Sequence, residues 1–231
     1  MIGPCKVFVV FPSVYPTRAA KSVEKWRAMG YQTGVYLNST TQGDSGAHKE
    51  WRGPYNGYWD ACNFMARILT QGEESTGIVV YASDDIDPDP THTADELSAQ
   101  FVGHFPNYFG VMQPCGDKQG IDATGKPAAA RICGSPWLGR EWVRRAFGGM
   151  GAVDSRFRQF YGDELLYEVS KKLGVLWMRP DLTQYHYHWS FGHERQQPYQ
   201  RKNSEAHWQK DKDLFMAEKA AGFPNSEPLP E

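Results

Sequence analysis

Apolar and polar positions alternate in blocks along the first half of the chain, and the blocks predict strands and helices in turn. Lys6–Ser13 is almost continuously apolar, which is typical of a strand buried on both faces. Thr17–Gly30 has apolar residues at helical spacing, with Thr17 as the expected cap and Gly30 as the expected end. Thr33–Leu37 then predicts a second strand, so the three blocks form a strand–helix–strand unit with parallel pairing.

The alternation continues as far as Gln113. The polar, glycine-rich stretch 38–54 predicts a loop. After it we expect a helix over 55–72, a strand over 77–82, a helix over 91–101 with a capping box of Thr93 and Glu96, and a strand over 109–113. This order predicts an α/β fold, with a single domain whose mostly parallel central sheet is flanked by helices. In such sheets ligands bind beyond the carboxyl ends of the strands.

The second half of the chain is less regular. Helices are expected over 139–149 and 162–174, a strand over 175–178, and strand-like alternation in the segment 184–190. From Glu194 onward the chain is polar. We therefore expect one domain over 1–193 and a polar C-terminal extension over 194–231, with an amphipathic helix and a disordered tail.

Composition narrows the function classes only a little. The net charge is −2, so no overall basic field indicates nucleic acid, although the C-terminal half is more basic than the acidic middle. The four cysteines form no CxxC pair, which argues against a cysteine-based zinc site. No segment approaches the length of a membrane span, so we expect no membrane partner and a cytoplasmic protein, in the host cytoplasm if it is viral.

Acidic residues gather where the third expected strand ends, in the stretch "IVVYASDDIDPDP". Asp84, Asp85 and Asp87 repel one another at this spacing, so each favours water or a cation. Carboxylates one or two positions apart at a strand end suit a hard divalent cation, Mg²⁺ or Mn²⁺. The alternative is an ordinary turn, because Asp-Pro pairs often begin loops.

Two further groups carry possible chemistry. His186 and His188 alternate along one segment, so both imidazoles can face one site and bind a divalent metal, or else pack as structural histidines. Asp163 and Glu164 open a predicted helix. They could complement its dipole, or supply a general base aimed into a cleft.

The order of these parts resembles the GT-A-type glycosyltransferases, close to the family 2-like transferases. The resemblance covers about residues 6–189 and rests on the order and spacing of "KVFVVFPS", "YNGYWDACNFMARI", "IVVYASDDIDP", "GDELLYEVSKKLG" and a late "HYH". It implies a nucleotide-binding part over about 1–90 and an acceptor-binding part over about 91–193. It also implies a nucleotide-sugar donor, with a UDP-sugar expected, and an inverting transfer.

The resemblance also assigns roles to individual residues. Pro12 and Ser13 match the nucleoside-binding position, and Asp85 and Asp87 match the DxD spacing, with Asp84 as a rival ligand beside the donor. His186 or His188 matches a late histidine that completes the metal shell in some members. Asp163 matches the base, but Gly162 stands where the family has an acid, so Glu164 is a second candidate. "GSPWLGREW" matches an acceptor-side loop, in which Trp137 would stack on a sugar or base.

The acceptor stays open at this stage. It could be a glycan, or a hydroxymethylated pyrimidine in DNA as in phage-type transferases. For DNA, arginines near the expected acceptor side (Arg140, Arg144 and Arg156 among them) would meet phosphates. Two rival functions remain: a nucleotidyltransferase, although "FPSVYPTR" lacks the usual phosphate-binding glycines, and a non-catalytic nucleotide- or sugar-binding module.

Overall fold

A mixed sheet forms the centre of the protein in the computed structural model, which describes residues 5–71, 76–116, 130–189 and 196–230. The strands within these ranges follow the order β3-β2-β1-β4-β6-β5-β7. Only β6 is antiparallel to its neighbours. Their bounds are β1 Val7–Ser13, β2 Gln32–Asn38, β3 Lys49–Gly53, β4 Ile78–Tyr81, β5 Val111–Pro114, β6 Trp137–Gly139 and β7 Leu176–Arg179.

Helices cover both faces of this sheet. The α1 and α3 helices contribute to one buried cluster, and α2, α4 and α5 contribute to the other. Successive side chains of β1 point to opposite faces of the sheet, so the strand contributes to both clusters: Val9 belongs to the first and Val10 to the second. The helices are α1 Pro16–Ala28, α2 Tyr58–Thr70, α3 Ala94–His104, α4 Arg140–Gly149 and α5 Gly162–Lys172. The α/β class and the mostly parallel sheet are thus confirmed.

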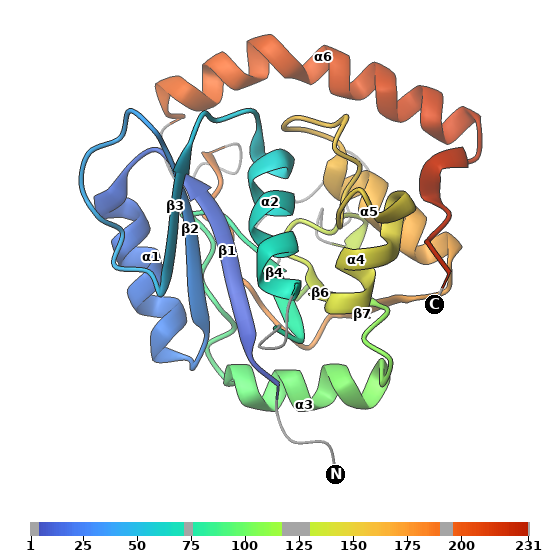
Figure 1. The fold of residues 1–231 in the computed structure, drawn as a ribbon, viewed down its shortest axis with the longest axis horizontal. Helices are drawn as coiled ribbons and strands as arrows, with labels where there is room; N and C mark the ends of the chain where they lie inside the picture. The colour runs from blue at the N-terminus through green and yellow to red at the C-terminus, as the bar shows by residue number, and fades with distance from the viewer. Residues whose placement is uncertain (1–4, 72–75, 117–129, 190–195, 231) are drawn as a thin grey trace.

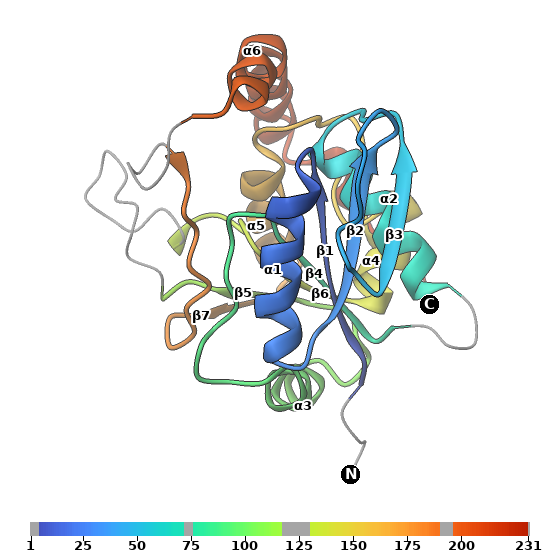
Figure 2. The same ribbon diagram turned by 90° about the vertical axis from the view of Figure 1, so that its left-hand side faces the viewer.

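The C-terminal helix α6, Pro198–Ala220, crosses the molecule at the edge where the parallel strands end (Figures 1 and 2). It is tied to the domain by Asp211, whose carboxylate accepts backbone N–H groups of Arg158, Gln159 and Phe160 at 3.3, 2.9 and 2.9 Å. The expected helix is therefore present and packs on the domain. The tail is ordered where we expected disorder: Pro224–Ser226 forms a 3₁₀ helix, and the Leu229 N–H donates to the Arg145 carbonyl.

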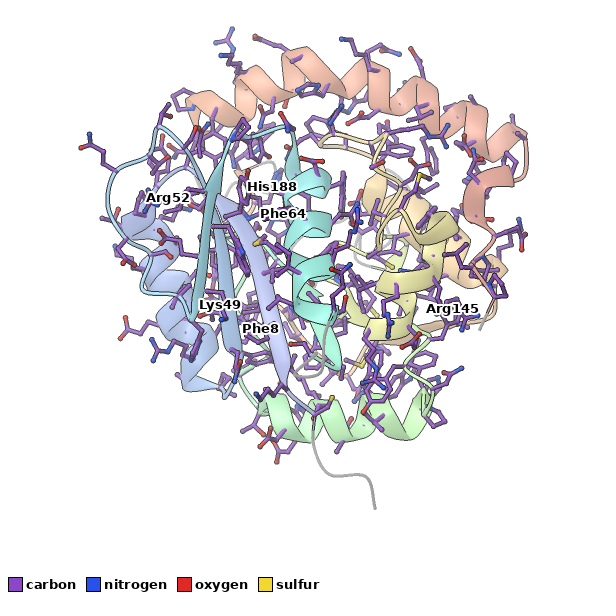
Figure 3. All side chains as sticks on the ribbon, in the orientation of Figure 1. Phe8, Lys49, Arg52, Phe64, Arg145 and His188 are labelled. Carbon is purple, nitrogen blue, oxygen red and sulfur yellow. The ribbon has the colours of Figure 1, made fainter. Side chains whose placement is uncertain are left out.

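Three local predictions were wrong, each for a physical reason. The β3 strand lies inside the expected loop and is a polar edge strand that includes Lys49 and Arg52 (Figure 3), so it shows no apolar run. The β6 strand has three residues, too few for a period to appear. Thr17 does not cap α1, because the chain enters that helix at Tyr15, with Pro16 at the first helical position.

The described part of the chain contains no helix that is both long and apolar enough to cross a membrane.

Candidate functional site

A cavity of about 870 Å³ opens at the carboxyl edge of the parallel strands, between the sheet and α6. In the sheet, β2 and β3 follow one another on one side of β1, and β4 lies on the other side. Open α/β sheets bind ligands at such a reversal of strand order. Ser13, the last residue of β1, and Asp84, just beyond β4, both line the cavity and meet across this point at 2.6 Å, Ser13 Oγ to Asp84 Oδ2.

The two adjacent aspartates after β4 already have a positive partner. Arg18, in the first turns of α1, lies with Nε 2.9 Å from Asp84 Oδ1 and a terminal nitrogen 3.5 Å from Asp85 Oδ2. The side chains of both aspartates are 5% exposed. Sequence reasoning missed Arg18. The sequence near Arg18 gives one indication of its role. The residue is a cation near the N-terminus of a helix, where the helix dipole favours anions.

Burial raises the pKa of both carboxyls, and their different neighbours separate the two. The pKa of Asp84 rises to about 6 through burial, against the opposing effect of Arg18. For Asp85, burial is outweighed by the hydrogen bond and charge of His186 together with Ser83 and Arg18, which hold its pKa well below the usual range. At neutral pH Asp85 is therefore the firmly ionised member of the pair.

His186 and His188 both line the cavity, as their alternation predicts. The segment that carries them pairs with the aspartate segment: the Tyr187 N–H donates to the Asp85 carbonyl, and the Asp87 N–H to the Tyr185 carbonyl, each at 2.9 Å. His186 Nε2 lies 3.5 Å from Asp85 Oδ1, and the two imidazole centroids are 5.0 Å apart. His188, labelled in Figure 3 near the strand ends, has its pKa lowered to about 4 by burial and by the charge of His186.

Asp87 does not join this cluster. Its carboxylate binds Lys25 of α1, with Nζ 2.7 Å from Oδ2, and the residue is not among those that line the cavity. Of the two residues at DxD spacing, only Asp85 thus faces the site, and Asp84 is its neighbour there.

Whether these side chains suit a divalent cation can be judged from the donor set. Within the described ranges no group of three or more His, Cys, Asp or Glu side chains is preassembled as a metal cage. Asp85 and His186 nevertheless present an anionic oxygen and an imidazole nitrogen side by side. Mg²⁺ and Mn²⁺ are often held by one or two protein ligands together with substrate phosphates. The residues therefore fit a cation that is completed by a diphosphate.

A second pair of acids faces the cavity from another element. Asp163 and Glu164 lie in the first turn of α5 and both line the cavity. Burial, together with the charge and hydrogen bonding of Asp163, raises the pKa of Glu164 well above its usual range. Its Oε2 is buried without a hydrogen-bond partner in the described part of the chain. These surroundings therefore favour the protonated form of Glu164.

The turn before α5 explains why this chain has glycine at 162. Tyr161 occupies the N-cap position in the left-handed region, at φ 59°. A Cβ added to Gly162 would lie 2.3 Å from the indole ring of Trp59, so no larger residue fits there without a shift. An acid at position 162 is thus sterically excluded, and the two acids that follow it are the ones presented to the cavity.

The expected acceptor residues do not line the cavity. Trp137 is fully buried, with its indole N–H donating to Gln184 Oε1 at 3.1 Å, so it cannot stack on an acceptor. Arg140 lies at the opposite end of β4, where its N–H binds the Gly77 carbonyl. Arg144 pairs with Glu141, and Arg156 joins Asp154 to Glu218 of α6. The start of the expected acceptor-side loop, Gly134 and Ser135, does line the cavity, but these four side chains lie away from it. Sequence spacing could not show which end of the sheet each side chain occupies.

The cavity also includes residues that the sequence did not single out. Asn38 ends β2 beside Pro12 and Ser13, and a polar residue directly after an apolar strand was the available signal. The α6 helix contributes another wall, for which no local signal exists because the helix is distant in sequence. Its lining residues include Tyr199, Lys202, Asn203, His207 and Trp208.

No protein-family model matches the chain, and no curated protein matches it.

Proposed function

We propose that the protein is a metal-dependent, inverting glycosyltransferase of GT-A type, which moves a sugar from a nucleotide-sugar to an acceptor hydroxyl. One observation carries the proposal. Three groups far apart in sequence (Asp84 and Asp85, Asp163 and Glu164, His186 and His188) line one cavity at the strand-order reversal. A UDP-sugar is the expected donor.

The donor's nucleoside would lie against Pro12, Ser13 and Asn38, with its diphosphate directed toward Asp85. Asp85 and His186 would hold Mn²⁺ or Mg²⁺ there. When bound, this cation neutralises the diphosphate and so makes it a better leaving group.

Asp163 is the proposed base. It removes the proton from the acceptor hydroxyl as that oxygen attacks the anomeric carbon, and the bond from that carbon to the diphosphate oxygen breaks. The raised pKa of Glu164 favours its protonated form, which cannot accept a proton, so Asp163 is the better candidate.

The structure reduces the support for a DNA acceptor. The arginines that were to meet phosphates lie outside the cavity, and the α6 wall presents one lysine and one histidine among aromatic, amide and hydroxyl groups. These groups suit a neutral hydroxyl-rich acceptor better than a duplex backbone.

The test is turnover of a panel of UDP-, GDP-, CDP- and ADP-sugars with Mn²⁺, measured as released nucleoside diphosphate, with EDTA as the control. We expect one nucleotide class to be turned over only with the cation. Duplex DNA containing 5-hydroxymethylcytosine, added as acceptor, separates the two acceptor classes. Pyrophosphate release from a nucleoside triphosphate would instead indicate a nucleotidyltransferase, and tight donor binding without turnover a binding module.

A further inference from the structure

The inward face of α6 changes character along the helix. Toward the C-terminus, Asp211 and Phe215 are buried and fasten α6 to the domain. Closer to the N-terminus, Asn203 and Trp208 line the cavity instead, and Trp208 is 41% exposed. A helix face that served packing alone would be apolar along its whole length. The half of α6 that faces the cavity therefore presents its side chains to a ligand.

Residues 158–161 face this half of the helix. Asp211 binds their backbone N–H groups, and the rings of Trp208 and Tyr161 lie 6.1 Å apart between centroids. Tyr161 also lines the cavity, and it occupies the N-cap position of α5, two residues before Asp163. The two rings therefore lie on the side of the cavity that carries the proposed base.

A pair of amide side chains joins the same two segments. Gln159 Oε1 accepts a hydrogen bond from the Tyr55 hydroxyl at 2.9 Å and lies 3.5 Å from Asn203 Nδ2, and all three residues line the cavity. The Gln159 NH₂ group and the Asn203 carbonyl oxygen have no hydrogen-bond partner in the described ranges. One donor and one acceptor thus stand side by side. A hydroxyl group satisfies both, because it accepts one hydrogen bond and donates another.

From these contacts we infer that α6 and residues 158–161 form the acceptor subsite, and that this subsite binds a saccharide. A sugar ring packs against Trp208 and Tyr161, and one of its hydroxyl groups binds the amide pair of Gln159 and Asn203. The inference rests on the proposed function, because it names the acceptor class for the same cavity. The α6 helix lies outside residues 6–189, so the resemblance to the glycosyltransferases assigns it no role.

Charge and polarity favour a saccharide over other acceptors. An anionic acceptor would meet the two acids Asp163 and Glu164 at the start of α5, with one lysine and one histidine of α6 to attract it. A purely apolar acceptor would leave the amide pair without hydrogen bonds. A sugar ring offers hydroxyl groups to the amides and C–H groups to the aromatic rings.

Phe64 of α2 provides a matched control. It is 44% exposed, against 41% for Trp208, and it does not line the cavity (Figure 3). Its truncation therefore removes a similarly exposed aromatic ring from another part of the surface.

The experiment is saturation-transfer NMR titration with the methyl glycosides of glucose, galactose, mannose and N-acetylglucosamine and with their β-linked disaccharides, with and without UDP and Mn²⁺. The proteins are the wild type, Trp208→Ala, Trp208→Phe, Asn203→Ala and Phe64→Ala, with circular dichroism to check folding. We expect at least one saccharide to bind, and Trp208→Ala to weaken its binding by about tenfold or more. Trp208→Phe, which keeps a ring, should lose less than Trp208→Ala. Asn203→Ala should lose about threefold or more, while Phe64→Ala behaves as the wild type.

Donor turnover, measured in parallel, separates the inference from the proposed function. Unchanged saccharide affinity in Trp208→Ala or in Asn203→Ala would overturn the inference and leave the proposed function standing. So would a wild type that turns over a nucleotide-sugar but binds no saccharide, or that transfers the sugar only to hydroxymethylated DNA. Saccharide binding that depends on Trp208 and Asn203, without turnover of any nucleotide-sugar, would support the subsite and overturn the proposed function. Absence of both activities would overturn both.

Discussion

Two pairs of adjacent acids line the same cavity, and their surroundings give them opposite chemistry. Arg18 lies within 3.5 Å of both Asp84 and Asp85, so its charge partly neutralises the pair, and the His186 imidazole lies 3.5 Å from Asp85. No ion pair joins Asp163 or Glu164 to a basic side chain in the described residues, and burial drives a proton onto Glu164 instead.

The difference shows that spacing alone does not assign a role to neighbouring carboxyls. A pair that lies against a guanidinium is stabilised in its ionised form. A pair that shares a proton is prepared for proton transfer. The predictions below test this contrast, beginning with the largest expected effect.

Asp163→Asn should reduce turnover by about 100-fold or more, because an amide cannot accept the acceptor's proton near neutral pH. Asp163 lies within the first helical turn and not at the N-cap, so the substitution should leave stability nearly unchanged. The measurement is the rate of donor turnover at saturating donor, with donor affinity measured in parallel. Glu164→Gln is the matched control. Full activity in Asp163→Asn with loss in Glu164→Gln would transfer the base to Glu164.

Asp85→Asn should weaken Mn²⁺-dependent UDP binding by more than about tenfold, a loss of more than about 1.4 kcal/mol. Its carboxylate is the ionised group beside His186, so the amide removes the main anionic ligand. Calorimetry with UDP, with and without Mn²⁺, measures the effect. Equal UDP affinity in the two buffers for the wild type would remove the cation from donor binding altogether.

How far the sequence predicts this molecule depends on the range of the interactions involved. Buried strands such as β1 and β4 have continuous apolar runs, and the acids that follow β4 come to the cavity because parallel strands end at one edge. The polar edge strand β3 had no such run. The α/β class and the position of the acids at the strand ends could therefore be predicted from local pattern.

Contacts between segments that are distant in sequence could not be predicted from local pattern. Nothing near Trp137 indicates that Gln184 covers its indole, and nothing in α6 indicates that Asp211 fastens the helix over the cavity. Arg18 was missed for the same reason, because its aspartates lie more than sixty residues away in sequence. The nearby arginines were misplaced because helical spacing does not show which end of the sheet a helix occupies.

Glu164→Gln should stabilise the protein at pH 8 by at least about 1.4 kcal/mol, the equivalent of one pKa unit. The pKa of Glu164 is higher in the folded than in the unfolded state, so the folded state binds more protons between the two values. Stability is then fully present below about pH 4.5, the unfolded value, and falls as pH rises. Glutamine stays neutral and removes this slope.

Urea unfolding of the wild type and Glu164→Gln at pH 5 and pH 8 measures the effect. The stability difference between the two proteins should grow with pH. A constant difference would mean that Glu164 is ionised in the folded protein, and that the contrast between the two acid pairs does not hold.

Asp87→Asn should have the smallest effect, although Asp87 stands at DxD spacing from Asp85. Its partner Lys25 is 54% exposed, and exposed ion pairs contribute about 0–1 kcal/mol. The Asp87 backbone N–H keeps its bond to Tyr185, so the pairing of the two segments survives the substitution. Mn²⁺ affinity, measured by the same calorimetry as for Asp85→Asn, should change by less than about threefold, or about 0.6 kcal/mol. A loss as large as that of Asp85→Asn would show that Asp87 leaves Lys25 and turns into the cavity when the cation binds.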